Sequence, residues 1–206
     1  SDASFLHLNP VNAVITNIDN DHLGTYQNKF ENLKQTYIDF IHQVPFYGAI
    51  FLCIDDQHLK SIIPMISRPI ITYGISNQAD IQAVNIRHDA NKMFFKIKDN
   101  KYKKIDFEIV INFPGEHFVR NTLAAISIGL EYGVSINNIK KAIANFKGVA
   151  RRYEIYDDIL IKDKRIKVID DYGHHPTEIE AVIRATKKGF SKKKINLVFQ
   201  PHRNTR

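Results

Sequence analysis

The chain has few of the features that define secreted, membrane-spanning or zinc-binding proteins. Its 206 residues include a single cysteine, Cys53, so no disulfide can form within the chain. Cys53 lies in the apolar run 49–54, where a thiol most often serves as a small buried hydrophobic side chain. No run approaches the roughly 18 apolar residues of a membrane span, and neither a secretory signal nor a zinc-ligand spacing is present. We therefore expect a globular protein of the reducing cytoplasm, without a membrane span.

A phosphate-binding loop of the form Gly-x-x-x-x-Gly-Lys-Ser/Thr is also missing from the chain. In proteins that have this loop, its backbone amides and its lysine hold the β- and γ-phosphates of a nucleotide. The sequence begins at Ser1 without an initiator methionine and ends at Arg206, shortly after a strand-like segment over 195–199. We therefore expect a piece of a longer protein, and a fragment that is inactive alone in any reaction driven by phosphate transfer.

The formal net charge of +7 would suit an anionic partner. Many of the lysines, however, cluster in the runs 101–104 and 187–194, a pattern that is typical of solvated faces and turns. The aromatic residues near the first run, Tyr102 and Phe107, lie at strand spacing, as a sheet core requires, rather than as a base-stacking platform. No helix-turn-helix pattern occurs. We therefore expect no nucleic-acid partner.

Apolar strands and amphipathic helices alternate over roughly the first third of the chain. Helices are predicted where apolar residues recur every three or four positions, and strands where short apolar runs end in polar loops. The expected order is strand 11–15, helix 30–44, strand 49–54, helix 57–63 and strand 70–73. This alternation predicts an α/β fold with a parallel sheet.

The pattern then changes to three adjacent strand-like segments, which predict a small antiparallel meander. Two helices follow, the first of them ended by Gly133. A candidate boundary at 148–150 divides the chain into domains over 1–149 and 150–206. The meander is expected over 80–87, 92–98 and 103–111, and the two helices over 117–132 and 136–146. In the second domain, strands are expected over 159–161, 166–169 and 195–199, and a helix over 176–188.

The most informative stretch joins a predicted strand to a predicted helix, where open α/β sheets place their ligands. It reads Asp170-Asp171-Tyr172-Gly173-His174-His175-Pro176-Thr177-Glu178. Proline followed by threonine and glutamate is typical of the first turn of a helix. A structural turn needs one aspartate and one glycine, but it does not need two histidines. The cluster of carboxylates and imidazoles therefore predicts a functional site rather than a solvated turn.

This stretch resembles the signature of the Mur ligase family, and within it the ligases that join L-alanine to UDP-N-acetylmuramate. Other stretches match that family in the required order, so that the resemblance spans essentially the whole chain. They are Ser1 to Leu6, Thr16-Asn17-Ile18 with Asp21-His22, Phe30 to Phe40, Phe113 to His117 with Asn121 and Ala124-Ala125, and Gln200-Pro201-His202-Arg203. Five or more ordered motifs are far more specific than any one of them.

The resemblance implies a fold and an activity. The fold is a central ATP-binding domain over 1–149, with a parallel sheet and a small meander, followed by the beginning of a Rossmann-like C-terminal domain over 150–206. The activity is ATP-dependent amide-bond formation between UDP-N-acetylmuramate and L-alanine through an acyl phosphate, in peptidoglycan synthesis. ATP and Mg²⁺ are the implied cofactors.

The resemblance also implies individual roles. His174 is placed at the reacting muramyl carboxylate, as a catalytic and substrate-binding residue, and His22 at a magnesium ion. A neutral imidazole is an unusual Mg²⁺ ligand, so His22 needs carboxylates nearby, such as Asp19 or Asp21 at the same strand end. The acidic partner that the family uses lies upstream of Ser1. Contacts to anionic groups of the substrate are implied for His202, Arg203 and Arg206.

Four further residues are implied at the nucleotide. His117 and Asn121 lie four positions apart on one helix face, and an amide presents the donor and acceptor that suit an adenine edge. The family has a second asparagine where Phe118 stands here. Arg152 is implied at the nucleotide and Asp171 at its ribose. For Arg152, a guanidinium suits phosphate or ribose oxygens, but an interdomain salt bridge fits the sequence equally well.

Two other functions compete with the alanine ligase. One is the murein-peptide recycling ligase, which joins a tripeptide to the same sugar nucleotide and shares several motifs. Tyr172-Gly173 before the histidines and Gln35-Thr36-Tyr37 on the first helix favour the alanine enzyme. The other is a non-catalytic nucleotide-binding remnant, because the phosphate loop is absent. Lys34 is not assigned as a modified lysine, since that position in related ligases falls nearer Tyr37.

Overall fold

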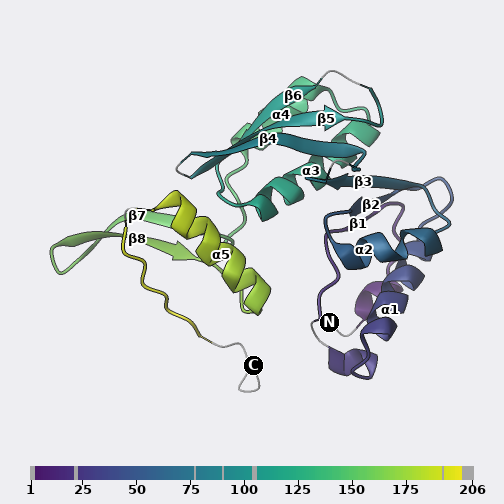
Figure 1. The fold of residues 1–206 in the computed structure, drawn as a ribbon, viewed down its shortest axis with the longest axis horizontal. Coiled ribbons are helices and arrows are strands. Elements are labelled where there is room, and N and C mark those ends of the chain that lie inside the picture. Colours follow the sequence, from purple (N-terminus) through teal and green to yellow (C-terminus); the bar gives the residue numbers. More distant parts are fainter. Residues whose placement is uncertain are drawn as a thin grey trace.

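The chain forms a mixed α/β sheet domain followed by a hairpin and a helix (Figure 1). The computed structural model describes residues 3–20, 23–76, 78–89, 91–103, 106–191 and 193–200. In chain order the elements are η1 (Ser4–His7), β1 (Ala13–Ile15), η2 (Leu23–Tyr26), α1 (Phe30–Gln43), β2 (Ile50–Cys53), α2 (Gln57–Ile62), η3 (Ile63–Met65), β3 (Ile70–Gly74), β4 (Ile81–Asp89), β5 (Lys92–Asp99), β6 (Phe107–Ile111), α3 (Glu116–Glu131), α4 (Ile136–Asn145), β7 (Glu154–Ile161), β8 (Lys164–Asp170) and α5 (Pro176–Gly189).

Six strands form one sheet in the order β1-β2-β3-β4-β5-β6. The neighbours from β1 to β4 are parallel, and those from β4 to β6 are antiparallel. The predicted parallel sheet and antiparallel meander are therefore confirmed, as two halves of one mixed sheet that share β4. Because β1, β2 and β3 are parallel, the loops after their carboxyl ends leave the sheet at one edge.

The core lies on both faces of the parallel half. All four residues of β2 are buried, because β1 and β3 flank it, α2 packs against it on one side and α3 lies across β2, β3 and β4. Cys53 is buried in this strand, as its apolar setting predicts, and burial raises the pKa of its thiol. In the antiparallel half, β6 alternates buried and exposed residues, as a strand with one covered face should.

The helices follow from their apolar spacing. In α3, the buried residues Val119, Leu123, Ile126 and Leu130 recur every three or four positions and form one stripe. The helix ends at Gly133, whose φ of 71° is open to glycine at little cost. Its amide donates to the carbonyl of Leu130 at 3.1 Å, so the predicted stop is confirmed. No helix among the described residues is long and apolar enough to cross a membrane.

The second unit consists of the antiparallel hairpin β7–β8 and the helix α5. The strand predicted over 195–199 is wrong, because residues 193–200 have no regular structure and Val198 is 94% exposed. A strand needs a neighbour for its backbone groups, and β8 pairs only with β7 within the described chain. A parallel Rossmann-like sheet in this unit stays a prediction.

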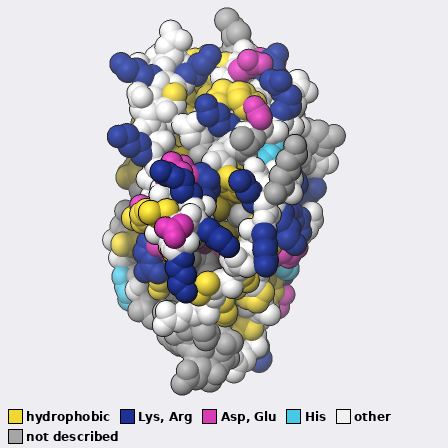
Figure 2. Space-filling view, turned by 90° about the vertical axis from the view of Figure 1, so that its left-hand side faces the viewer, with side chains coloured by type: hydrophobic (Ala, Val, Ile, Leu, Met, Phe, Trp, Pro, Cys, Tyr) yellow, Lys and Arg dark blue, Asp and Glu magenta, His cyan; other side chains and the backbone are white. Residues whose placement is uncertain are grey.

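Basic side chains are spread over the surface of the second unit, with acidic ones among them (Figure 2). Lys162, Lys164, Arg165 and Lys187 are exposed, and so is Asp163 beside them. Most of these lysines lie on the hairpin or late in α5, where charged side chains remain solvated. The charge of this surface is therefore interspersed rather than gathered into one basic groove.

Candidate functional site

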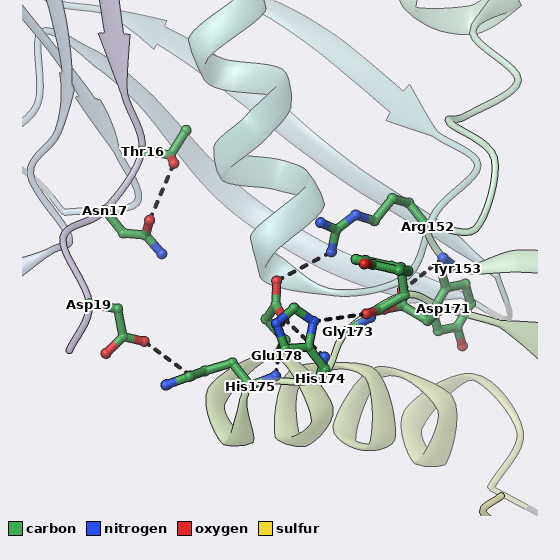
Figure 3. Close-up of polar contacts among 11 residues, drawn as sticks. Thr16, Asn17, Asp19, Arg152, Tyr153, Asp171, Gly173, His174, His175 and Glu178 are labelled. Atoms are coloured by element: carbon green, nitrogen blue, oxygen red, sulfur yellow. Dashed lines mark hydrogen bonds and ion pairs between the residues drawn. The ribbon is translucent and has the colours of Figure 1, made fainter. Parts of the chain in front are cut away.

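Three segments that are distant in the sequence meet at the carboxyl edge of the parallel strands. They are the loop after β1, the start of α3 and the turn between β8 and α5 (Figure 3). A hydrogen bond from Thr177 to Asp19 joins the first segment to the third. The start of α3 lies against α5, because a Cβ added to Gly115 would stand 3.3 Å from the Cβ of Ala185. Four of the nine predicted site residues, His117, Asn121, Asp171 and His174, lie on these segments.

The turn before α5 is built around Asp171. One carboxylate oxygen accepts the amide of Gly173 at 2.7 Å, and the other accepts the amide of Tyr153 at 2.9 Å. A Cβ at 173 would come within 2.7 Å of the Asp171 carboxylate, so a larger residue there would displace that carboxylate. Asp171 thus ties the start of β7 to the turn. A carboxylate has about four lone-pair positions, so both of its oxygens keep the capacity to accept a further hydrogen bond.

The first turn of α5 is closed by Glu178. One of its oxygens accepts the backbone amides of His174 and His175 at 3.2 and 3.3 Å, and the other accepts Nη1 of Arg152 at 3.3 Å. Pro176 occupies the first helical turn, as predicted. Arg152 thus forms a salt bridge within the second unit, not the interdomain salt bridge that was one of its two possible roles. The guanidinium remains about half exposed, and its role at a nucleotide stays a prediction.

These contacts shift the pKa of Glu178. Burial alone would raise the pKa of this carboxyl, but the hydrogen bonds from His175, His174 and Arg152 favour the charged form and together outweigh burial. The pKa therefore lies below its ordinary value of 4.5. Because the folded-state pKa is the lower one, this group stabilises the fold fully above about pH 4.5, and the contribution is lost as pH falls through the folded-state value.

The Glu178→Gln variant is expected to lose less thermal stability than the wild type below pH 4.5, because it has no carboxylate to protonate. The melting temperature should be measured from pH 7 to pH 3. Glu180→Gln is the matched control, since Glu180 is exposed on the same helix and, among the described residues, pairs only with Arg184. Parallel pH profiles for Glu178→Gln and the wild type would contradict this assignment.

His174 lies between the turn and the helix. Its Nδ1 is 3.3 Å from the backbone oxygen of Tyr172, and its ring meets the Tyr172 ring edge-on at 5.6 Å. A carbonyl oxygen can only accept, so this contact favours the tautomer with the proton on Nδ1. In that tautomer Nε2 is the basic nitrogen, which is the form that a general base or a hydrogen-bond acceptor requires.

The start of α3 brings His117 to the second unit. Burial lowers the pKa of His117 below 6.5, Arg120 and Arg152 lower it further, and the nearby Asp171 carboxylate opposes them. The imidazole is therefore neutral at pH 7. Asn121 lies one turn later on α3, exposed, and its side chain makes no hydrogen bond within the part of the chain that the structure describes. Its amide is available to a ligand.

Phe118, next to His117 on α3, is surrounded by aromatic rings. Its ring lies 4.2 Å from that of His117, 5.1 Å from that of Phe113 and 6.2 Å from that of Tyr153 at the domain boundary. Tyr153 is buried, and its hydroxyl accepts a hydrogen bond from Thr186 of α5 at 3.1 Å. Phe118 therefore joins α3 to the second unit by aromatic packing. A phenyl ring offers no donor or acceptor to a base edge.

Four predicted site residues lie outside the described residues: His22, His202, Arg203 and Arg206. Among the described residues, no group of three histidine, cysteine, aspartate or glutamate side chains could hold a metal ion. Lys34 pairs with Glu31 at 2.9 Å on α1.

The sequence interpretation missed one pair at the same edge. Asp55 follows β2 and accepts the amides of Ile75 and Ser76 at 2.8 and 2.9 Å, and it also accepts Nε of Arg120 at 2.8 Å. It thereby ties the end of β3 to the helix that carries His117. The available signal was a carboxylate directly after a buried strand, at the edge where the other site residues gather.

Comparison with known proteins identifies relatives of both units. The Mur ligase middle domain matches residues 2–129, and the Mur ligase glutamate ligase domain matches residues 151–206. UDP-N-acetylmuramate–L-alanine ligase of Hydrogenovibrio crunogenus is 50% identical over 206 residues, which are all of this chain and 44% of that protein. The chain thus spans less than half the length of this relative.

Two solved structures share the fold. UDP-N-acetylmuramate-alanine ligase MurC of Thermotoga maritima superposes with a TM-score of 0.78 at 24% identity, over 98% of this chain and 44% of that one. The murein peptide ligase of Psychrobacter arcticus superposes with a TM-score of 0.67 at 27% identity, over 92% of this chain and 37% of that one. With the middle-domain match covering more than half of its residues, the chain belongs to the Mur ligase family.

Proposed function

We propose that this chain is the central and early C-terminal part of a ligase that joins L-alanine to UDP-N-acetylmuramate at the expense of ATP, in peptidoglycan synthesis. The observation that carries the proposal is the 50% identity to a ligase of that name over the whole chain. We assign residues 1–149 to the central ATP-binding domain and 150–206 to the C-terminal domain. A cytoplasmic location, where both nucleotides are available, belongs to the same proposal.

The proposed reaction has two steps. A carboxylate oxygen of the muramyl group attacks the γ-phosphorus of ATP, the bond to the β–γ bridging oxygen breaks, and ADP leaves with an acyl phosphate formed. The amine of L-alanine then attacks the acyl carbon, inorganic phosphate leaves, and the amine gives up a proton. The cleavage of ATP drives the reaction. The protein must therefore orient the two anionic reactants and receive the proton that the amine loses.

The described residues can supply much of this. Asn121 is exposed with an unused amide, and neutral His117 lies one turn before it, so both can pair with an adenine edge. Asp171 can accept a ribose hydroxyl while it holds its two backbone amides. Arg152 can bind an anionic oxygen in place of Glu178. Basic Nε2 of His174 can hydrogen-bond the reacting group or take its proton.

The remaining roles depend on residues outside the described part of the chain. When bound, Mg²⁺ neutralises phosphate charge during transfer. His22 would be its protein ligand in this chain, next to Asp19, which follows the same strand. His202, Arg203 and Arg206 would bind anionic groups of the sugar nucleotide.

The substrate choice can be tested in a full-length ligase, meaning this sequence joined to a phosphate loop and a sugar-nucleotide domain. One route is a chimera in which this chain replaces the matching 44% of the Hydrogenovibrio crunogenus enzyme. Phosphate release from ATP should require both UDP-N-acetylmuramate and L-alanine. Release driven by the murein tripeptide instead would identify the recycling ligase, and no release with either would leave a nucleotide-binding remnant.

A further inference from the structure

A single carboxylate connects the two units on the side of the site. Oδ2 of Asp19, in the loop after β1, lies 3.5 Å from Nδ1 of His175 (Figure 3). The same oxygen accepts the hydroxyl of Thr177 at 3.1 Å. Asp19 and Thr177 are 158 residues apart in the sequence. Two side chains of one helical turn thus converge on one oxygen of the other domain.

The Asp19 carboxylate is also oriented from its own side. Its other oxygen, Oδ1, accepts the backbone amide of Asn20 at 2.7 Å. Oδ2 faces the N-terminal turn of α5, where the aligned peptide dipoles favour a negative charge. A hydrogen bond, an imidazole and the helix terminus therefore favour the same position of this carboxylate.

The contact of Asp19 with His175 and Thr177 also affects the position of His174. Glu178 accepts the amides of both His174 and His175, so these two residues and the first turn of α5 move together. Holding Thr177 and His175 against the first domain therefore also fixes His174 against it. The two adjacent histidines then have different partners, since His174 contacts Tyr172 of its own turn and His175 contacts Asp19.

The units also meet at a second, apolar point, where Phe118 packs edge-on against Tyr153. Tyr153 is 1% exposed, whereas the side chains of Asp19 and His175 are 39% and 21% exposed. Water can replace a partly exposed polar contact at little cost, but it cannot replace buried aromatic packing. The aromatic contact is thus the persistent one and the polar contact the reversible one.

We propose that His175 and Thr177 are positioning residues, which bind Asp19 and thereby hold His174 at the carboxyl edge of the sheet. Their part in catalysis rests on the proposed function, because it assumes that His174 acts on the substrate. The contact itself does not depend on that function, so the two can be tested separately.

The contact can be measured in the chain itself by double electron–electron resonance. Spin labels would be placed at Asp39→Cys on α1 and Lys187→Cys on α5, two exposed positions, while buried Cys53 remains unlabelled. Thr177→Val keeps the side-chain shape and removes the hydroxyl. It should increase the population with longer label separations by about 2- to 10-fold, the range expected for one partly exposed hydrogen bond. Asp19→Ala should do at least as much.

Two controls define the outcome. Thr177→Ser retains the hydroxyl and should restore the wild-type distances, and Glu180→Gln, on the exposed face of the same helix, should leave them unchanged. Wild-type distances in Thr177→Val, or equal broadening in Thr177→Val and Thr177→Ser, would overturn the proposal.

Turnover in the full-length ligase supplies the second readout. Thr177→Val should lower kcat by a similar 2- to 10-fold, and Thr177→Ser should rescue it. If Thr177→Val opens the units while His174→Ala leaves turnover normal, the proposed function fails and the contact stands. If His174→Ala abolishes turnover while Thr177→Val changes neither distances nor kcat, the positioning role fails and the proposed function stands.

Discussion

Replacing His174 with alanine in the full-length ligase is expected to lower kcat by roughly 10²-fold or more while the dissociation constant of ATP stays nearly unchanged. The imidazole lies in the turn before α5, and its Nδ1 contact to Tyr172 leaves Nε2 as the basic nitrogen. Of the groups proposed for the nucleotide, His117 and Asn121 lie on α3 and Arg152 at the domain boundary, whereas Asp171 lies in the same turn as His174 and is held by the amides of Gly173 and Tyr153. Loss of a group that acts mainly in the transition state lowers kcat and kcat/KM together.

The measurement combines steady-state phosphate release with an ATP titration. His7→Ala is the matched control, because His7 is an exposed histidine of η1 and has no proposed role. A second variant, His174→Gln, keeps a polar side chain but removes the ionisable ring, and it should also lose turnover. Near-normal turnover in His174→Ala would show that the residue serves only the turn. An equal loss of ATP affinity would instead place it at the nucleotide.

The sheet domain could be predicted from the sequence because its signals are local. Each parallel strand is a short apolar run, and each helix has apolar residues at helical spacing, as in α3. The meander follows from three adjacent strands with no room for a helix between them. The sequence did not show that both parts form one sheet, since the pairing of β3 with β4 depends on tertiary contacts.

The strand predicted over 195–199 was wrong because a local signal was not supported by a tertiary contact. The segment has a strong local preference for a strand, with Ile195, Leu197, Val198 and Phe199 in five residues. A strand also requires a partner, and the described chain offers none beside β8. Local preference without a neighbour leaves the backbone groups to water.

In the site, too, local features could be predicted and contacts between distant residues could not. The turn from Asp170 to Glu178 was predicted because its residues are contiguous, and the N-terminal turn of α5 begins where proline indicates. The contacts of Asp19 with Thr177 and of Asp55 with Arg120 could not be predicted, because they join residues 158 and 65 positions apart. No local pattern encodes a pairing of that range.

Asn121→Ala in the full-length ligase is expected to weaken ATP far more than UDP-N-acetylmuramate or L-alanine. An amide that pairs with a base edge leaves buried polar atoms unsatisfied when it is removed, at a cost of about 1–3 kcal/mol, or roughly 5- to 150-fold in affinity. The loss should fall toward the upper end of that range. Phe118 stands where the family has a second asparagine, and its ring is engaged with Phe113 and Tyr153, so it cannot share the base.

Titrations of all three ligands on the wild type and the variant give the comparison, and Asn137→Ala provides a control at an exposed asparagine of α4. Because Asn121 makes no hydrogen bond within the described chain, its loss should leave the melting temperature of the free protein unchanged. A selective loss of ATP affinity at constant stability therefore separates base recognition from a role in the helix. An unchanged ATP constant, or an equal loss for all three ligands, would mean that this face of α3 does not contact the adenine.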